Sequence, residues 1–125
     1  MRLLLDTHIF LWMVNGNLRV GTRERELIAN AKEVYVSSAT LWEIAIKFSV
    51  GKLRVDMNAL LEEIATGGFR QLPVMNRHAM AVAQLPLHHR DPFDRMLVAQ
   101  AMTEPMRLLT SDAQLKAYSE LVIAF

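Results

Sequence analysis

The chain has 125 residues, of which 52% are hydrophobic and 22% charged, a composition typical of a globular protein and unlike a disordered or fibrous one. It contains no cysteine, which excludes disulfides and thiolate metal sites, and its formal net charge of +1 excludes a strongly basic protein. The apolar run at positions 3–5 meets an acid at once and is too short for a signal peptide or a membrane span. We therefore expect one cytoplasmic domain over residues 1–125.

Short apolar runs separated by helical patterns indicate the fold class. Buried strands are predicted at 3–5, 34–36, 107–110 and 121–123, with a weaker one at 70–74, where Pro73 limits pairing. Between them we expect helices just after Asp6 and at 22–32, 39–50, 56–65, 76–84 and 92–103, and a short one ending at 118. This alternation predicts an α/β sandwich with a mainly parallel sheet.

Three helix starts can be assigned to particular residues. Asp91 is suited to the N-cap of the helix 92–103, because Pro92 then falls at the first helical position, where its missing N–H costs nothing. Ser38 is predicted to cap the helix 39–50, whose apolar positions, Phe48 among them, are expected to face the core. Asn76 is predicted to cap the helix 76–84.

Acidic side chains occupy equivalent places in this layout. Asp6 follows the first strand, Asp112 follows the strand 107–110, and Asp94 lies in the first turn of a helix, near the positive end of its dipole. Glu43 joins them from the helix after the second strand. Because parallel strands end at one edge of a sheet, and ligands bind in the crevice there, we expect these acids to meet.

Each acid also has an ordinary structural explanation. Asp6 and Asp112 are suited to cap helices, Asp94 to pair with a helix dipole, and Glu43 to form a surface pair with Lys47. The set is harder to explain, since four carboxylates in one crevice repel one another unless a cation joins them. Hard oxygen ligands of this kind favour Mg²⁺ or Mn²⁺ over zinc.

Four ordered blocks of sequence make the chain similar to a known family. It resembles the PIN-domain proteins, and within them the VapC-type toxins of bacterial type II toxin–antitoxin pairs. The matching blocks are 4–8, 38–47 with 51–53, 89–101 and 109–112. They span nearly the whole chain, in the family's order.

The resemblance implies a three-layer α/β/α fold and a metal-dependent endoribonuclease using Mg²⁺ or Mn²⁺. It places the family's first three acids on Asp6, Glu43 and Asp94 and its more variable fourth acid on Asp112. Asp6 and Asp94 would be the main metal ligands, and the other two acids would complete the cluster and help to orient the attacking water. Hydrolysis would leave 5′-phosphate and 3′-hydroxyl ends.

The resemblance also implies partners and supporting residues. A VapB-type antitoxin would hold the toxin inactive by laying its C-terminal segment across the groove, and a homodimer is expected. Thr7 and Ser38 match small hydroxyl positions that would hold a water molecule beside the metal.

Basic and histidine side chains near the acids have competing interpretations. Lys47 and Lys52 are candidates for RNA contact but equally for plain solvation. Arg90 and Arg95 flank the expected site and are candidates for phosphate contact, although Arg95 is equally suited to neutralise a surface acid. For the pair His88–His89 we expect a solvated loop, because adjacent side chains diverge and no third zinc ligand follows at helical spacing.

Other functions fit the sequence less well. A haloacid-type phosphatase requires a second Asp two residues after the first, where His8 stands here, and a receiver domain requires an early pair of adjacent acids, which is absent. A PIN-fold binding module without catalytic turnover, or another metal-dependent phosphate hydrolase, remains an alternative to the ribonuclease.

Overall fold

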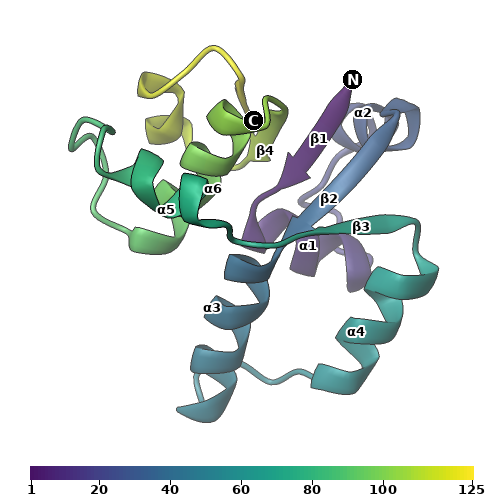
Figure 1. Cartoon of the computed structure of the whole chain (residues 1–125). Coiled ribbons are helices and arrows are strands. Elements are labelled where there is room, and N and C mark those ends of the chain that lie inside the picture. The colour runs from purple at the N-terminus through teal and green to yellow at the C-terminus, as the bar shows by residue number, and fades with distance from the viewer.

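The computed structural model describes residues 1–125 and contains one parallel sheet (Figure 1). Its strands are β1 Arg2–Leu5, β2 Glu33–Ser37, β3 Phe69–Leu72, β4 Arg107–Thr110 and β5 Val122–Ala124. They lie in the order β3-β2-β1-β4-β5, and every neighbouring pair is parallel. The first strand of the chain is therefore the centre of the sheet.

Helices connect the strands at nearly the predicted positions. They are α1 Thr7–Val14, α2 Thr22–Asn30, α3 Ser38–Ser49, α4 Met57–Thr66, α5 Asn76–Val82, α6 Pro92–Thr103 and the 3₁₀-helix η1 Ala113–Ala117. None of them combines the length and the apolar character needed to cross a membrane.

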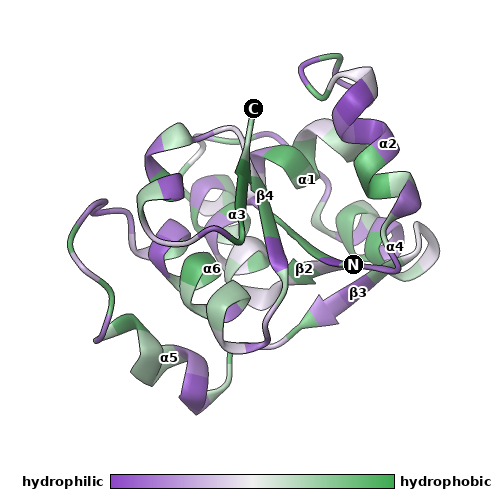
Figure 2. Ribbon diagram, turned by 90° about the horizontal axis from the view of Figure 1, so that it is seen from above, coloured by the Kyte–Doolittle hydropathy of each residue, from purple (hydrophilic) through white to green (hydrophobic).

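The sheet is buried on both faces. Leu3 and Leu5 of β1 pack in a core cluster with side chains of α1, α2 and α4, whereas Leu4, which points to the other face, packs with α6 and η1. Apolar strands thus lie between helical layers, and α2, on the outside, is mainly hydrophilic (Figure 2). The predicted three-layer α/β/α fold is confirmed.

Short side chains cap most helices, as the sequence indicates. The carboxylate of Asp91 accepts hydrogen bonds from the backbone N–H groups of Phe93 and Asp94, with Pro92 in the first helical turn. Asp6 caps α1 in the same way. The Asp91–Pro92 start of α6 is confirmed, and it fixes the position of Asp94 in the first turn.

Two predicted caps are wrong by one residue. Ser37, and not Ser38, is the N-cap of α3, because its backbone is still extended and its hydroxyl accepts from the N–H of Ala39. Ser38 is already helical and exposed. Asn76 is the first residue of α5 and not its cap, since an extended Met75 precedes the helix.

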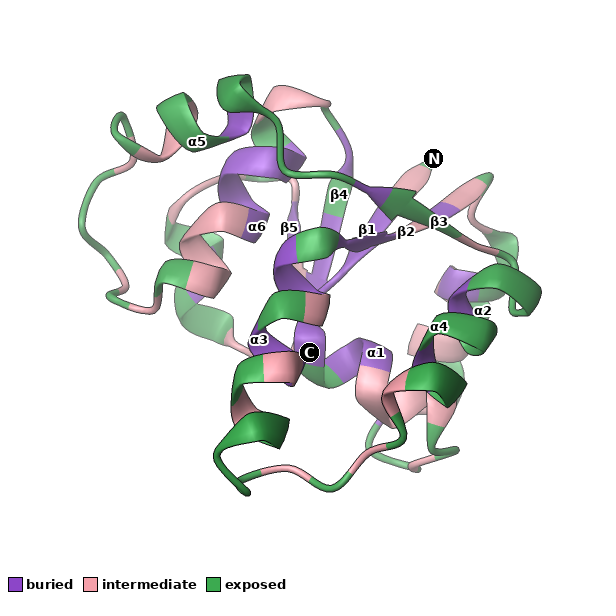
Figure 3. Cartoon of the chain, turned by 60° about the horizontal axis from the view of Figure 1, so that its bottom comes forward, coloured by how far each residue is buried: buried purple, intermediate pink, exposed green.

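The far half of α3 is exposed, contrary to the prediction for Phe48. This side chain is 47% exposed, and Trp42 and Ile46 are exposed as well. The helix begins against the sheet but extends beyond it, so no layer covers its last turns (Figure 3). The spacing of apolar residues predicted one buried face along the whole helix, but α3 is longer than the part of the protein that it packs against.

A buried polar network fixes α5 and α6 to the sheet. Gln100 is fully buried and accepts a hydrogen bond from the Ser37 hydroxyl at 2.6 Å, while its amide nitrogen donates to the Pro73 carbonyl at 3.3 Å. His78, the buried residue of the otherwise largely exposed α5 (Figure 3), lies with Nε2 2.6 Å from Glu104 of the α6 C-cap. The sequence pattern did not reveal this network.

Removing one member of the network should destabilise the fold. We expect Gln100→Ala to lower the free energy of unfolding by about 2–3 kcal/mol, because it leaves the buried Ser37 O–H without its acceptor and removes the donor to the Pro73 carbonyl. Urea unfolding followed by circular dichroism measures the change. Met102→Ala, at an exposed position of the same helix, is the control, with an expected change within about 0.5 kcal/mol. Equal stability of the two variants would contradict the role of the network.

Candidate metal centre

Asp6 is the buried acid at the end of the central strand. Its backbone N–H continues the ladder to the Leu109 carbonyl at 3.0 Å, and its side chain is almost fully buried. One carboxylate oxygen accepts from the backbone N–H groups of His8 and Ile9, and the other accepts from the Thr110 hydroxyl. Burial raises the pKa of Asp6 above its usual value, although these hydrogen bonds oppose the shift.

Glu43 reaches the same edge of the sheet from α3. It is 5% exposed, its Oε1 accepts the Thr7 hydroxyl at 2.7 Å, and its Oε2 pairs with Lys47 at 2.9 Å. Thr7 follows Asp6 directly, so this hydroxyl joins the region of the first acid to the second. The pairing of Glu43 with Lys47 occurs as the sequence allowed, but the carboxylate is buried and not on the surface.

Asp94 is the acid most affected by its surroundings. It lies in the first turn of α6 with its side chain 21% exposed. Burial, the largest cause, and the negative charges of Asp91, Asp6 and Glu43 together raise the pKa of Asp94 to about 7, although His89 opposes the shift. The negative charges of Asp6 and Glu43 therefore act on Asp94.

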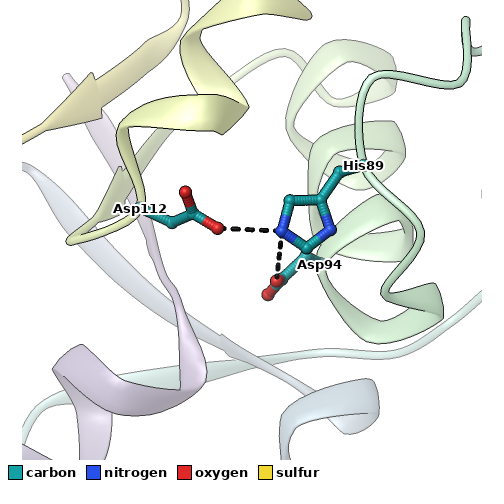
Figure 4. A group of neighbouring side chains, drawn as sticks. All are labelled: His89, Asp94 and Asp112. Carbon is teal, nitrogen blue, oxygen red and sulfur yellow. Dashed lines mark hydrogen bonds and ion pairs between the residues drawn. The ribbon is translucent and has the colours of Figure 1, made fainter.

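Asp112 approaches Asp94 from the other side, after β4 (Figure 4). Each of Asp94, Asp112 and His89 offers one ligand atom, and these atoms lie within 4.8 Å of one another. The backbone N–H of Asp112 donates to the Thr110 hydroxyl, which in turn donates to Asp6. A chain of hydrogen bonds therefore joins the fourth acid to the first.

The prediction for His89 is wrong. Its ring is 17% exposed and lies between two acids, with Nε2 2.9 Å from Asp112 Oδ2 and 3.7 Å from Asp94 Oδ2. Only His88 keeps the exposed position expected for the loop. The two adjacent side chains do diverge, so that His88 points to solvent and His89 points toward the acids. The nearby Asp91–Pro92 cap is the signal that could have located His89 beside the start of α6.

Asp94 and Asp112 bring carboxylate oxygens close together, and the hydroxyls of Thr110 and Thr7 connect Asp6 and Glu43 to the same edge of the sheet. All of the donor atoms from the acids are carboxylate oxygens, which Mg²⁺ and Mn²⁺ prefer. The pKa values of Asp6 and Asp94 are both raised, so keeping both ionised near neutral pH costs free energy that a bound cation would offset. Lys47 is the one ammonium group paired with an acid of this set.

Arg95 does not face the acids as a free phosphate contact. Its guanidinium donates to the backbone carbonyls of Pro86 and Val82, and to the hydroxyl of Tyr118 at 3.0 Å. It therefore fixes the loop before α6, because a single guanidinium binds several carbonyls along that segment. Arg90 and Lys52 are exposed and form no side-chain hydrogen bond or ion pair, which leaves them accessible to a ligand.

An apolar pocket of about 540 Å³ lies beside the start of α6. Trp42, Val74, Phe93 and Met96 contribute to its lining, and the rings of Trp42 and Phe93 meet edge to face at 5.2 Å. None of the four acids lines it. The pocket is thus separate from the carboxylate cluster.

Comparison with known proteins agrees with this architecture. The sequence model of the PIN domain matches residues 3–121, and the chain therefore belongs to the PIN domain family. No curated protein matches the chain significantly.

Solved structures share the fold at low sequence identity. The chain is similar to VapBC2 from Rickettsia felis bound to a promoter DNA fragment, with a TM-score of 0.74 and 17% identity over 100% of this chain and 98% of that one. For DNA-bound VapBC from Salmonella typhimurium the TM-score is 0.70 at 15% identity, over 100% and 97%. For FitAcB from Neisseria gonorrhoeae it is 0.62 at 22% identity, over 90% and 89%.

The raised pKa of Asp94 makes stability depend on pH. Between pH 3.8 and about 7 the folded protein keeps a proton that the unfolded chain releases, so in EDTA the free energy of unfolding should fall as the pH rises through this range. Asp94→Asn removes this contribution, and near neutral pH we expect the variant to be about 1–2 kcal/mol more stable than the parent. Urea unfolding at about pH 5 and about pH 7.5 measures the difference.

Glu62→Gln, at an exposed position of α4 without an ion pair, is the matched control and should follow the parent at both pH values. If Asp94→Asn and Glu62→Gln show the same pH dependence, the crowding of Asp94 is contradicted.

Proposed function

We propose that residues 1–125 act as one cytoplasmic domain, a Mg²⁺- or Mn²⁺-dependent endoribonuclease that serves as the toxin of a toxin–antitoxin pair. The observation that supports this most strongly is the group of buried and half-buried carboxylates at one edge of a PIN-domain sheet. The raised pKa values of Asp6 and Asp94 fit a site that is completed by a cation.

In this proposal Asp6 and Asp94 are the main ligands of the cation. Glu43 and Asp112 complete the set, directly or through water, and help to orient the nucleophile. A bound divalent ion supplies polarisation of the phosphodiester and a lowered pKa for the attacking water. The hydrolysis leaves a 5′-phosphate and a 3′-hydroxyl, with no covalent protein intermediate.

The chain's own residues hold these oxygens in place. Thr110 and the backbone N–H groups at the start of α1 orient Asp6, and Thr7 and Lys47 hold the two oxygens of Glu43. The first turn of α6 fixes the backbone of Asp94. Such fixed orientation reduces the rearrangement needed during the reaction.

Several exposed residues are candidates for RNA contact. Arg90 and Lys52 are the stronger candidates, because their charges are free to meet phosphate oxygens. Lys47 is half-exposed but already paired with Glu43, so its contact with RNA would be shared with that acid.

We further propose a VapB-type antitoxin as partner, and a homodimer. The similar solved structures support the antitoxin, since they are described as VapBC and FitAB complexes, several of them bound to DNA. A PIN-fold binding module without turnover, or another metal-dependent phosphate hydrolase, is the competing function.

Cleavage of RNA tests the proposal. We expect single-stranded RNA to be cut in the presence of Mg²⁺ and not in EDTA, and Asp6→Asn or Asp94→Asn to lower the rate by at least about a hundredfold. Glu62→Gln should cut like the parent. Analysis of the ends should find 5′-phosphate.

Three results would contradict the nuclease. Equal rates in the parent and both Asn variants would remove the assigned acids. A folded parent that binds Mn²⁺ but cuts no RNA would favour a binding module. Hydrolysis of a small phosphate ester without RNA cleavage would favour another phosphate hydrolase.

Growth of a bacterial host tests the toxin role separately. Expression of the chain alone should arrest growth, and Asp94→Asn should remove the arrest. Co-expression of a cognate VapB-type antitoxin should restore growth and yield a complex that co-purifies. Normal growth with a chain that is active in vitro would contradict the toxin role and leave the nuclease intact.

A further inference from the structure

His89 is held rigidly on both sides of its backbone. Its N–H donates to the Tyr118 hydroxyl at 2.9 Å, and its carbonyl accepts from the Arg95 guanidinium at 3.4 Å. Arg95 also binds other carbonyls of the same loop. The loop before α6 therefore presents the His89 ring in a defined position (Figure 4).

The hydrogen bonds of the ring define which nitrogen carries the proton. Nδ1 accepts the backbone N–H of Asp91 at 3.1 Å, so the neutral ring carries its proton on Nε2. Nε2 lies 2.9 Å from Asp112 Oδ2 and donates to it. At 3.7 Å, Asp94 Oδ2 is beyond hydrogen-bond distance of the same nitrogen.

This proton also excludes His89 as a cation ligand in the observed arrangement. A ligating Nε2 needs a free lone pair, and moving the proton to Nδ1 would set it against the Asp91 N–H. His89 is thus a hydrogen-bond donor that faces the acids from outside the ligand set.

Asp112 depends on this donor for its orientation. Its Oδ1 accepts the Gln114 N–H at 2.9 Å as the cap of η1, and its Oδ2 has His89 as its one protein donor. The Asp112 side chain is 33% exposed, so without His89 its Oδ2 would turn toward solvent. With His89 in place, Oδ2 lies close to Asp94.

We propose that His89 is a positioning residue of the cation site, whose Nε2–H holds the Asp112 carboxylate beside Asp94. This inference rests on the proposed function, because it deepens the ligand set of that site. Outer hydrogen-bond partners of metal ligands are worth about 10–100-fold in metal affinity. His89 acts through Asp112 and does not touch the cation.

Binding of Mn²⁺ provides a readout that is independent of activity. The free-ion signal in electron paramagnetic resonance measures the fraction of Mn²⁺ bound to the full chain, and RNA cleavage over a Mg²⁺ titration is measured in parallel. The variants are His89→Ala, His89→Gln, His89→Asn, Asp112→Ala and the double variant with His89→Ala. His88→Ala is the matched control, since its ring touches Tyr118 of the same anchoring group, with centroids at 5.1 Å, but none of the acids.

We expect His89→Ala to weaken Mn²⁺ binding by about tenfold or more and to raise the Mg²⁺ concentration needed for cleavage by a similar factor. His89→Gln should restore binding to within about threefold of the parent, because its amide nitrogen extends about as far as Nε2. His89→Asn, with the same amide on a shorter chain, should not. In the Asp112→Ala background, His89→Ala should add little, because the residue through which it acts is gone.

Equal Mn²⁺ binding by His89→Ala and His88→Ala would overturn the inference while leaving the nuclease in place. An equally large loss from His89→Ala in the Asp112→Ala background would overturn it too, as would restoration by Asn but not by Gln. If the parent binds Mn²⁺ with the expected pattern but cuts no RNA, the proposed function fails and the positioning role stands. A folded parent that binds no Mn²⁺ overturns both.

Discussion

Asp6 ends the central strand with a carboxylate that is 2% exposed and surrounded by hydrogen-bond donors. Burying a charged group is costly, and here Thr110 and the first N–H groups of α1 offset only part of the cost, because the pKa of Asp6 remains raised. A second half-buried acid, Asp94, lies in the same neighbourhood. The end of β1, the start of α1 and the start of α6 thus hold two acids whose ionised forms are both disfavoured, and this constraint is what the proposed cation would relieve.

Local sequence signals predicted most of the fold, because the signals and the structure have the same physical origin. Asp91 followed by Pro92 specifies a helix start whatever the tertiary context, and β1 is apolar throughout because both of its faces are covered. The edge of the sheet that carries the acids also followed from the sequence, because the parallel strand order predicts Asp6 and Asp112 at the same end. The errors at Ser38 and Asn76 are shifts of one residue: Ser37 and Ser38 are both suited to cap α3, and at α5 the helix begins on Asn76 itself, after the extended Met75.

The remaining features depend on contacts between distant parts of the chain, which spacing does not encode. His89 and Arg95 were misjudged because their partners, Asp112 and Tyr118, come from the last part of the chain. Loop residues of this kind have no periodicity that separates a solvated side chain from one facing a site. The buried position of Gln100 is a similar case, since its partners lie in other elements.

The hydrogen bond between Thr110 and Asp6 joins residues 104 positions apart, and β1 acquires its neighbour β4 only through that return of the chain. During translation the amino-terminal strand leaves the ribosome long before β4 is made. The edge of β1 that pairs with β4 therefore stays unpaired in the nascent chain. Until β4 is made, Asp6 and Asp112 cannot come together. A ribosome making this protein holds an incomplete polypeptide without the acidic centre until synthesis is nearly finished.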